Sequence, residues 1–412
     1  MLNQTQQQAA ICHECDLRLY IGEIRAGEKA ACPRCSNVIT RFHRDPIDRI
    51  LVFSVTALIC LFLSCIFNFI SLGLQGQAVD ISLFGAVSML LYLGEWGLSL
   101  VLLVVVLILP VVIALMLGLL AVTIKLRQVS RVTIWLLRIL DTLRFWNMAE
   151  IFFLGVLISM VKAMSLAEIS FGISFYTYGL FSSFLVAALL HVDQFQLAQL
   201  IKTPAPGRDI LIDAEEDEEP KVACHHCATV QKADRRRCSF CHSGLHRRKP
   251  KSLQRTWLFL ITALVLYLPA NLWPIMITVS LGETEPNTIL SGVLELWEDG
   301  SYPIAIIIFV ASVMVPIAKF FILFALCLSE QFHRFAKPQS KVMLYRVTEF
   351  IGRWSMVDVF VVAFLAALVQ LGTVMTVYPG PAALAFAGMV VATMLASASF
   401  DPRLLWESDE QS

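Results

Sequence analysis

The chain has little charge. Asp, Glu, Lys and Arg make up 16% of its 412 residues, whereas 57% of the residues are hydrophobic, and the mean hydropathy is +0.71. Soluble globular domains carry about 25% charged residues. The composition therefore excludes an ordinary soluble protein and predicts an integral membrane protein. Because the formal net charge is zero, only the distribution of charge along the chain is informative.

Several functional motifs are also missing. The sequence contains no Walker A motif, which argues against an ATPase. No Ser-His-Asp grouping, pair of buried carboxylates or open three-ligand zinc motif can be assembled, so we do not expect an enzyme. Residues 1–11 contain no Lys or Arg, so no cleavable signal peptide is predicted.

Eight of the cysteines form four Cys-x-x-Cys pairs, arranged in two sets. A gap of 16 residues (16–31) separates the pairs of the first set, and a gap of 10 residues (228–237) separates those of the second. A long hydrophobic block follows each set, so the chain is a tandem duplication of one unit, a metal ribbon plus a membrane bundle. The paired cysteines are Cys12, Cys15, Cys32, Cys35, Cys224, Cys227, Cys238 and Cys241.

Each set of four thiolates predicts one tetrahedral metal site, because each pair turns two sulfur atoms toward one ion at about 2.3 Å. Zinc is the expected metal, although iron uses the same four ligands and stays open. Disulfides fit poorly with a reducing compartment. The neighbouring His13, His225, His226 and His242 are surplus to a complete four-sulfur shell.

We expect eight membrane spans in two sets of four, because a helix needs about 20 apolar residues to cross about 30 Å of hydrocarbon. Segments 148–164 and 381–396 are short, which leaves open an alternative with six crossings and two re-entrant segments. The predicted spans are 50–72, 97–124, 148–164, 173–190, 256–279, 302–328, 357–378 and 381–396.

The basic residues predict the orientation. The loops 73–96 and 279–301 contain no Lys or Arg, whereas the loops 125–144 and 334–353 are rich in them. By the positive-inside rule the basic side is cytoplasmic, together with both termini and both ribbons. The predicted fold class is an all-α polytopic membrane protein with two parallel four-helix repeats, each preceded by a small cytoplasmic zinc ribbon with four cysteine ligands.

This organisation divides the chain into five parts. The segment between the two units has six acids in 213–219 and predicts a flexible, solvated linker. The parts are ribbon 1 (8–44), bundle 1 (48–200), an acidic linker (203–220), ribbon 2 (221–248) and bundle 2 (254–407).

Internal homology can be followed through both bundles. Residues 146–152 (WNMAEIF) match residues 354–360 (WSMVDVF) at the start of the third helix. Glu150 and Asp358 thus share one place, in the first helical turn, where the helix dipole favours a carboxylate. We interpret both as capping residues rather than as reactive groups.

Basic residues around ribbon 2 allow two interpretations. Arg235–Arg237 and Arg247–Lys249 form a patch that nucleic acid could bind. However, basic residues before a span also satisfy the positive-inside rule and attract anionic lipid head groups. Closed four-sulfur sites are structural. We therefore expect no nucleic-acid partner, and ribbons that brace the cytoplasmic face or dock the two halves together.

Two lysines lie within the predicted spans. Insertion scales put the cost of a Lys at mid-span at about 2.5 to 3.5 kcal/mol, so a retained one normally faces a cavity or a partner. Pro316 cannot donate a backbone hydrogen bond to the carbonyl of Ser312, which predicts a kinked polar spot near Lys319. The candidate transport site comprises Lys162, Ser165, Ser312, Lys319, Ser355 and Thr393.

Neither lysine is duplicated. Gln370 stands opposite Lys162 in the repeat, and Ile113 stands opposite Lys319. A site between the bundles would therefore be asymmetric. Because Lys162 is near a span end, its side chain could also simply reach the lipid head groups.

Four further motifs, LPAN (268–271), TILSGV (288–293), GRWSM (352–356) and FDPRL (400–404), accompany the eight ribbon cysteines. With them the chain resembles the paraquat-inducible protein A family of proteobacterial inner-membrane proteins over nearly its whole length. The resemblance implies an inner-membrane subunit that passes phospholipid between the inner membrane and a tunnel made by a periplasmic mammalian-cell-entry (MCE) domain protein, supporting envelope integrity.

Two alternatives stay open at this point. The protein could be a membrane-bound metal or redox sensor whose ribbons respond by losing metal. It could also be a scaffold that only anchors the MCE partner through its outer loops. A basic group within the bilayer, which would attract a phosphate head group, favours the transport role.

Overall fold

The computed structural model of the chain describes most of the sequence. The acidic linker predicted at 203–220 lies outside the described residues. These are 8–22, 25, 27–74, 77–128, 130–164, 168–202, 221–280, 283–298, 300, 302–332, 338–368, 370 and 375–406.

Within these residues, eight helices are long and apolar enough to cross a membrane, which confirms the predicted count. Each has at least 18 residues, so none has to be re-entrant on grounds of length. They are Pro46–Ile66, Trp96–Lys125, Arg131–Val161, Ile173–Leu190, Ser252–Leu272, Ala305–Phe332, Pro338–Leu368 and Pro381–Ser399.

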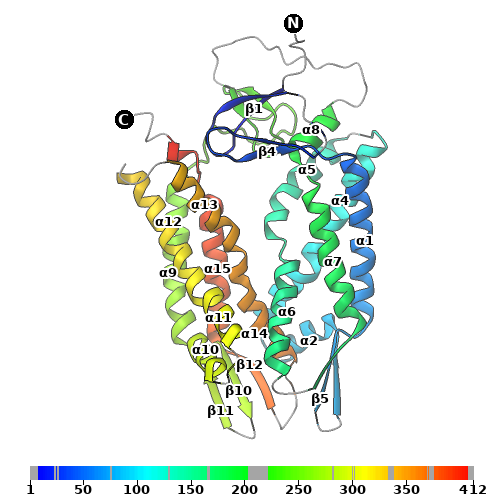
Figure 1. Cartoon of the computed structure of the whole chain (residues 1–412), viewed down its shortest axis with the longest axis vertical. Coiled ribbons are helices and arrows are strands. Elements are labelled where there is room, and N and C mark those ends of the chain that lie inside the picture. The colour runs from blue at the N-terminus through cyan, green and yellow to red at the C-terminus, as the bar shows by residue number, and fades with distance from the viewer. Residues whose placement is uncertain are drawn as a thin grey trace.

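The helices form two bundles that stand side by side (Figure 1). Bundle 1 consists of α1 (Pro46–Ile66), α3 (Trp96–Leu102), η1 (Leu103–Ile108), α4 (Leu109–Lys125), α5 (Arg131–Leu143), η2 (Arg144–Trp146), α6 (Ala149–Met164) and α7 (Ile173–Leu190). Bundle 2 repeats this order as α9 (Ser252–Leu272), α11 (Tyr302–Phe309), η3 (Val310–Met314), α12 (Val315–Phe332), α13 (Pro338–Gly352), η4 (Trp354–Met356), α14 (Val357–Leu368) and α15 (Pro381–Ser399). The first and last helices of each bundle, α1 with α7 and α9 with α15, pack along one another.

The third helix of each bundle is longer than predicted. The basic segments 125–144 and 334–353, expected to be loops, contain the helices α5 and α13. In α5 the buried residues Thr133, Leu136, Leu137 and Leu140 recur at helical spacing and form one apolar face. These basic residues therefore lie on amphipathic helices that extend the spans.

Three predicted spans end earlier than expected on their outer side, because the residues there form β-strands. β5 (Ile70–Leu74) follows α1, β10 (Met276–Ser280) follows α9, and β12 (Met375–Pro379) follows α14. These strands belong to two three-stranded antiparallel sheets, with orders β6-β5-β7 and β11-β10-β12. The remaining strands are β6 (Gln77–Ile81), β7 (Glu168–Phe171) and β11 (Glu283–Asn287).

A glycine closes the same corner in both bundles. A Cβ atom on Gly172 would lie 1.9 Å from the carbonyl oxygen of Asn68, and one on Gly380 would lie 2.0 Å from that of Pro274. Because only glycine lacks the Cβ atom, it alone permits this approach of backbone to backbone. The corner places the last helix of each bundle against the start of its outer sheet.

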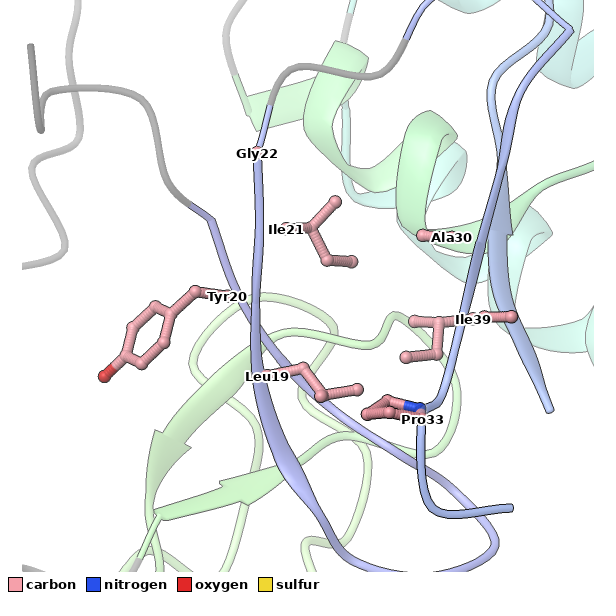
Figure 2. Close-up of a pocket in the computed structure, with 8 residues that line it drawn as sticks. Leu19, Tyr20, Ile21, Gly22, Ala30, Pro33 and Ile39 are labelled. Atoms are coloured by element: carbon pink, nitrogen blue, oxygen red, sulfur yellow. The ribbon is translucent and has the colours of Figure 1, made fainter. Parts of the chain in front are cut away.

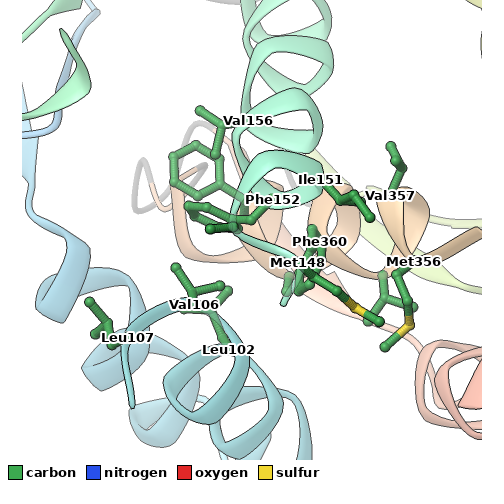
Figure 3. Packing of buried hydrophobic residues seen from close by; sticks show 14 of the residues in the cluster. Leu102, Val106, Leu107, Met148, Ile151, Phe152, Val156, Met356, Val357 and Phe360 are labelled. Carbon is green, nitrogen blue, oxygen red and sulfur yellow. The ribbon is translucent and has the colours of Figure 1, made fainter. Parts of the chain in front are cut away.

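The two bundles meet along α6 and α14. The rings of Phe152 and Phe360 pack edge to face with centroids 5.7 Å apart, and a Cβ atom on Gly155 would lie 3.1 Å from the Cβ of Phe360. Figure 3 shows Ile151 of α6 and Val357 of α14 directed toward one another in this layer. The interface is apolar and closely packed, so the halves form one body.

The ribbons lie at one end of the bundles and the outer sheets at the other (Figure 1). Ribbon 1 has two hairpins, β1 (Gln8–Ile11) with β2 (Arg18–Ile21) and β3 (Lys29–Ala31) with β4 (Val38–Arg41). Ribbon 2 has one hairpin of β8 (Lys221–Ala223) and β9 (Val230–Lys232). Three short helices complete the described fold: α2 (Leu83–Tyr92), α8 (Gln194–Lys202) and α10 (Ile289–Glu298).

Candidate metal centres and a buried polar column

Both cysteine sets converge as the sequence predicts. In ribbon 1 the Sγ atoms of Cys12 and Cys35 lie 3.5 Å apart, and those of Cys15 and Cys32 lie 3.4 Å apart. In ribbon 2 the matching Sγ distances are 3.4 Å for Cys224 and Cys241 and 3.6 Å for Cys227 and Cys238. Within each set all four sulfur atoms lie within 4.8 Å of one another, and all are buried.

This geometry fits a metal ion. A tetrahedral zinc site with Zn–S bonds of about 2.3 Å requires S···S separations of roughly 3.8 Å, close to the observed distances. Hydrogen bonding within each pair lowers the pKa of Cys12 and of Cys224 and raises the pKa of their partners Cys15 and Cys227. The thiolate is the form that binds a metal ion.

The backbone of each Cys-x-x-Cys pair forms a tight turn. The residue after the second cysteine is left-handed in all four pairs, with φ between 54° and 59°. Its amide donates to the carbonyl oxygen of the first cysteine, at 2.8 to 3.1 Å. This turn brings two sulfur atoms to one side of the chain, as the ligand spacing requires. The left-handed residues are Asp16, Ser36, Ala228 and His242.

The histidines beside the clusters do not join them. The rings of His13 and His225 face each other with centroids 6.0 Å apart. Burial is the main reason that the pKa of His13 and the pKa of His225 are both lowered to about 4. Both rings are therefore neutral at pH 7 and add no charge beside the thiolates.

The metal-binding end of each ribbon docks on the bundle of the other half. Glu14, between the first two cysteines, accepts a hydrogen bond from Nε of Arg346 on α13 at 2.9 Å. His226 has the matching place in ribbon 2, and its Nδ1 lies 3.1 Å from Oδ2 of Asp141 on α5. Because α5 and α13 are equivalent helices, the docking is crossed. This arrangement agrees with the expected bracing role.

Arg403, in the FDPRL motif after α15, joins both ribbons to bundle 2. Its side chain is only 1% exposed. Nε donates to the carbonyl oxygen of His13 at 3.0 Å, and a terminal nitrogen donates to that of Arg247 at 2.9 Å. The carboxylate of Asp16 lies 3.6 Å away. The buried guanidinium is thus satisfied by acceptors from both ribbons.

Ribbon 1 also carries an apolar cavity of about 440 Å³ between its hairpins (Figure 2). Leu19, Ile21, Pro33 and Ile39 line it, while the ring of Tyr20 points away. None of the described residues that line this cavity is charged, so they offer no ion pair to a phosphate group.

Lys319 is buried inside bundle 2. Its side chain is 2% exposed, and Nζ donates to Oγ1 of Thr393 on α15 at 3.1 Å. Among the described residues, no carboxylate lies within ion-pair distance of Nζ. A Cβ atom on Gly352, at the end of α13, would lie 2.7 Å from Nζ. Glycine at this position therefore leaves the space that the ammonium occupies.

A π-helical turn lies where the sequence predicts a kink. η3 precedes Pro316 in bundle 2, and η1 lies next to Pro110 in bundle 1. A proline lacks the amide hydrogen and its ring displaces the preceding turn, so the helix widens there. Ser312 lies in η3, where its hydroxyl donates to the carbonyl oxygen of Ile308 at 2.6 Å.

Asp358 is a polar residue whose role the sequence interpretation missed. It lies in the first turn of α14, as predicted, but it is 6% exposed and its Oδ2 has no hydrogen-bond partner among the described residues. Its carboxyl group lies beside Ser312. Glu150, by contrast, accepts a hydrogen bond from Asn147 at 3.0 Å. The one available sign was an acid in an otherwise apolar span.

Ser312, Lys319, Ser355, Asp358 and Thr393 together form what we term the polar column of bundle 2. The elements that carry them pack on one another. Ser312 and Lys319 are seven residues apart along the continuous helix of η3 and α12, about 10 Å. The column thus has two levels, with Lys319 and Thr393 at one and Asp358 and Ser312 at the other. Ser355 lies between Gly352 and Asp358 in the sequence, and its hydroxyl is buried without a partner among the described residues.

Two predicted site residues are not placed in this column. Ser165 lies outside the described residues. Lys162 belongs to α6 of bundle 1, but its side chain also lies outside the described part of the chain.

The eight spans and the two tetrathiolate clusters define a multi-pass membrane protein with two metal-binding ribbons. The family described as paraquat-inducible protein A matches residues 47–201 and 253–410. The chain belongs to this family, as the sequence motifs predict.

Named relatives cover nearly the whole chain. Intermembrane transport protein PqiA of Escherichia coli strain K12 is 36% identical over 407 residues, which cover 98% of this chain and 96% of that protein. Lipophilic envelope-spanning tunnel protein A of the same strain is 28% identical over 400 residues, covering 97% and 91%. A probable intermembrane transport protein of Haemophilus influenzae is 28% identical over 402 residues, covering 96% and 95%. No solved structure matches.

Proposed function

We propose that the protein is an inner-membrane subunit of an intermembrane lipid transport system. It passes phospholipid between the inner membrane and a tunnel formed by a periplasmic MCE-domain partner, and so supports envelope integrity. The observation that carries this proposal is Lys319, an ammonium buried in an apolar bundle beside a neutral hydroxyl. The printed names of the relatives, two of them intermembrane transport proteins and one an envelope-spanning tunnel protein, support the same role.

The chemistry of the column suits a lipid phosphate. A buried ammonium is costly unless an anion or several acceptors share its environment. Charge-assisted hydrogen bonds to phosphate are short and strong. Lys319 would bind the phosphate as a point charge, and the hydroxyl of Ser355 would donate to one of its oxygen atoms. Thr393, whose hydroxyl donates to the carbonyl oxygen of Val390 at 2.8 Å, would hold the ammonium in place. Lys162 and Ser165 stay in the proposed site on sequence grounds alone.

The ribbons are proposed to hold zinc. Four thiolates complete a tetrahedral shell, so bound zinc would supply rigidity and would leave no position for substrate. The eight cysteines hold the ion, and the left-handed turns aim their sulfur atoms. We propose no catalytic activity for the protein.

The topology follows from the charge distribution. With both ribbons and both termini cytoplasmic, the sheets β6-β5-β7 and β11-β10-β12 face the periplasm. These sheets would contact the MCE-domain partner. The proposed parts are the five named in the sequence analysis, with ribbons at 8–44 and 221–248, bundles at 48–200 and 254–407, and the linker at 203–220.

Photo-cross-linking in native membranes tests the transport role. A diazirine amino acid of methionine size replaces Met389, which is buried one turn from Thr393 on the same face of α15. The control is Met116, buried in α4 of bundle 1. Met314, exposed on the surface of bundle 2, reports capture of bulk lipid.

The proposal expects phospholipid to be captured at Met389 and not at Met116, and expects Lys319→Met to abolish the capture at Met389. Capture at Met314 alone would reject a lipid path through the column. Cross-links only to the periplasmic partner, from the outer sheets, would instead favour the scaffold alternative.

A further inference from the structure

We propose that Arg346 is a positioning residue through which the metal-loaded fold of ribbon 1 sets the geometry around Lys319, whereas ribbon 2 has no such role. The consequence for lipid binding rests on the proposed transport function. The structural linkage itself can be measured without lipid.

One end of this linkage is the metal cluster. Arg346 donates through Nε and a terminal nitrogen to both carboxylate oxygens of Glu14. The same terminal nitrogen donates to the carbonyl oxygen of Cys35 at 2.8 Å. Glu14 lies between the ligands Cys12 and Cys15, and Cys35 is itself a ligand. One guanidinium therefore bonds two of the turns that close the metal site.

The other end is the polar column. Arg346 and Gly352 are six residues apart on α13, about 9 Å along the helix. The hydroxyl of the neighbouring Tyr345 donates to the carbonyl oxygen of Ser397 on α15 at 3.1 Å. Thr393, the hydrogen-bond partner of Lys319, lies one turn from Ser397 on the same helix. Gly352 and Thr393, the two residues next to the ammonium of Lys319, thus lie on α13 and α15, and these two helices are hydrogen-bonded to each other next to ribbon 1.

The contact at Gly352 makes the site sensitive to small movements of α13. A Cβ atom there would already lie 2.7 Å from Nζ of Lys319, so little free space separates the ammonium from this helix. If the turns of ribbon 1 are no longer held by a metal ion, Arg346 loses fixed acceptors. A shift of α13 toward α12 would then displace the lysine from Thr393.

Ribbon 2 also contacts a helix of the other half, but the place that matches Lys319 in bundle 1 is occupied by an apolar residue. His226 bonds Asp141 on α5, the helix of bundle 1 that matches α13. The residue opposite Lys319 in bundle 1 is Ile113, which is buried in the apolar core. Among the described residues of bundle 1, movement of α5 therefore has no buried cation to displace. This difference supplies a matched control within one chain.

Hydrogen exchange of the full-length protein, followed by mass spectrometry, tests the linkage. Glu14→Gln keeps the shape of the side chain but removes the charge that binds Arg346, and His226→Asn is the matched change in ribbon 2. We expect the amides of 344–352 to exchange about tenfold faster in Glu14→Gln, because a charge-assisted contact that restrains the helix is lost. Exchange there stays unchanged in His226→Asn.

Metal content and a conservative variant separate positioning from loss of fold. Both variants are expected to keep the metal content of the native protein. Arg346→Lys, which keeps the charge but not the two-pronged geometry, should give an intermediate exchange rate. Unchanged exchange in Glu14→Gln, equal effects of the two ribbon variants, or loss of metal as the only change would each overturn the proposal.

Removal of one metal site extends the test. The double change Cys32→Ser and Cys35→Ser is expected to speed exchange in 344–352, whereas Cys238→Ser with Cys241→Ser is not. The photo-cross-link at Met389 then reports function separately. If exchange responds as expected but the native protein captures no lipid, the linkage stands and the transport proposal fails. If lipid is captured equally in the native protein and Glu14→Gln, the positioning role is wrong and the transport proposal stands.

Discussion

Bundle 1 and bundle 2 follow the same path, yet their interiors differ in chemistry. Ile113 and Leu185 of bundle 1 are 0% exposed and belong to its apolar core. Lys319 occupies the place of Ile113 in the repeat. Thr393 occupies the place of Leu185, because Thr393 lies thirteen residues after the corner glycine Gly380 and Leu185 lies thirteen residues after the corner glycine Gly172. At these two places the described interior of bundle 1 is apolar, whereas bundle 2 holds a buried cation. The duplicated frame has been kept while only one copy carries polar groups at these places.

The features that both halves keep are those that backbone geometry requires. Both have a glycine at the corner, a proline beside a π-helical turn, and left-handed turns at the cysteine pairs. These residues set the path of the chain in each half. The side chains that fill the bundle are free to differ as long as volume and burial are matched.

The largest expected effect comes from breaking one metal site. Apparent binding energies of structural zinc in small peptides are about 10 to 16 kcal/mol at pH 7, so Cys12→Ser or Cys224→Ser should each release one metal ion and unfold its own ribbon. Metal analysis of the purified protein checks the count per chain. Cys60→Ser in α1 is the control and should leave both ions bound. Loss of both ions in either variant would contradict independent sites.

The corner glycines give the next largest effect and test whether both halves need the same geometry. Gly172→Ala and Gly380→Ala would each place a methyl group about 2 Å from a backbone carbonyl oxygen, so the corner must open at a cost of about 3 kcal/mol. Thermal unfolding checks the two losses. Gly292→Ala, where nothing lies within 4 Å, should be neutral or stabilising. A harmless Gly172→Ala would show that only bundle 2 depends on its corner.

The polar difference between the bundles is tested by the same substitution at equivalent places. Lys319→Met should lower lipid capture and transport at least about tenfold, or about 1.4 kcal/mol, because the cation is lost while the volume is nearly kept. Ile113→Met should leave transport unchanged. Envelope integrity and the yield of folded protein are measured for both. Equal transport by the two variants would remove the basis for a site in bundle 2.

The smallest effect is expected at the two acids of the third helices. Asp358→Asn should raise the free energy of unfolding by about 1 kcal/mol, because a buried carboxyl group becomes a neutral amide, and one of its oxygen atoms has no hydrogen-bond partner among the described residues. Glu150→Gln should change it less, since Asn147 already bonds this carboxylate. Denaturation of the two variants in the same detergent makes the comparison. A larger effect at Glu150 would reverse the assignment of the two roles.

Much of the fold and part of the site could be predicted from local patterns. Four cysteine pairs at ligand spacing, apolar runs of spanning length and a proline near Lys319 each act through neighbouring residues. The outer strands could not be predicted in the same way, because β5 pairs with β7 and β10 pairs with β12, about 100 residues away in the chain. Their apolar residues therefore resembled the ends of spans. The helices α5 and α13 were missed because their basic residues dominated the interpretation as loops.

The sequence by itself determined the tandem architecture, the eight spans, the two metal ribbons and the family, since spacing, hydropathy and motifs express them directly. Only the tertiary structure decided which bundle each ribbon docks on, and that Oδ2 of Asp358 has no hydrogen-bond partner among the described residues while Glu150 accepts a hydrogen bond from Asn147. The physical reason is that these outcomes depend on contacts between residues far apart in the chain. Glu14 and Arg346 are in contact only because the two folded halves bring them together, and no periodicity in the sequence around either residue predicts this contact.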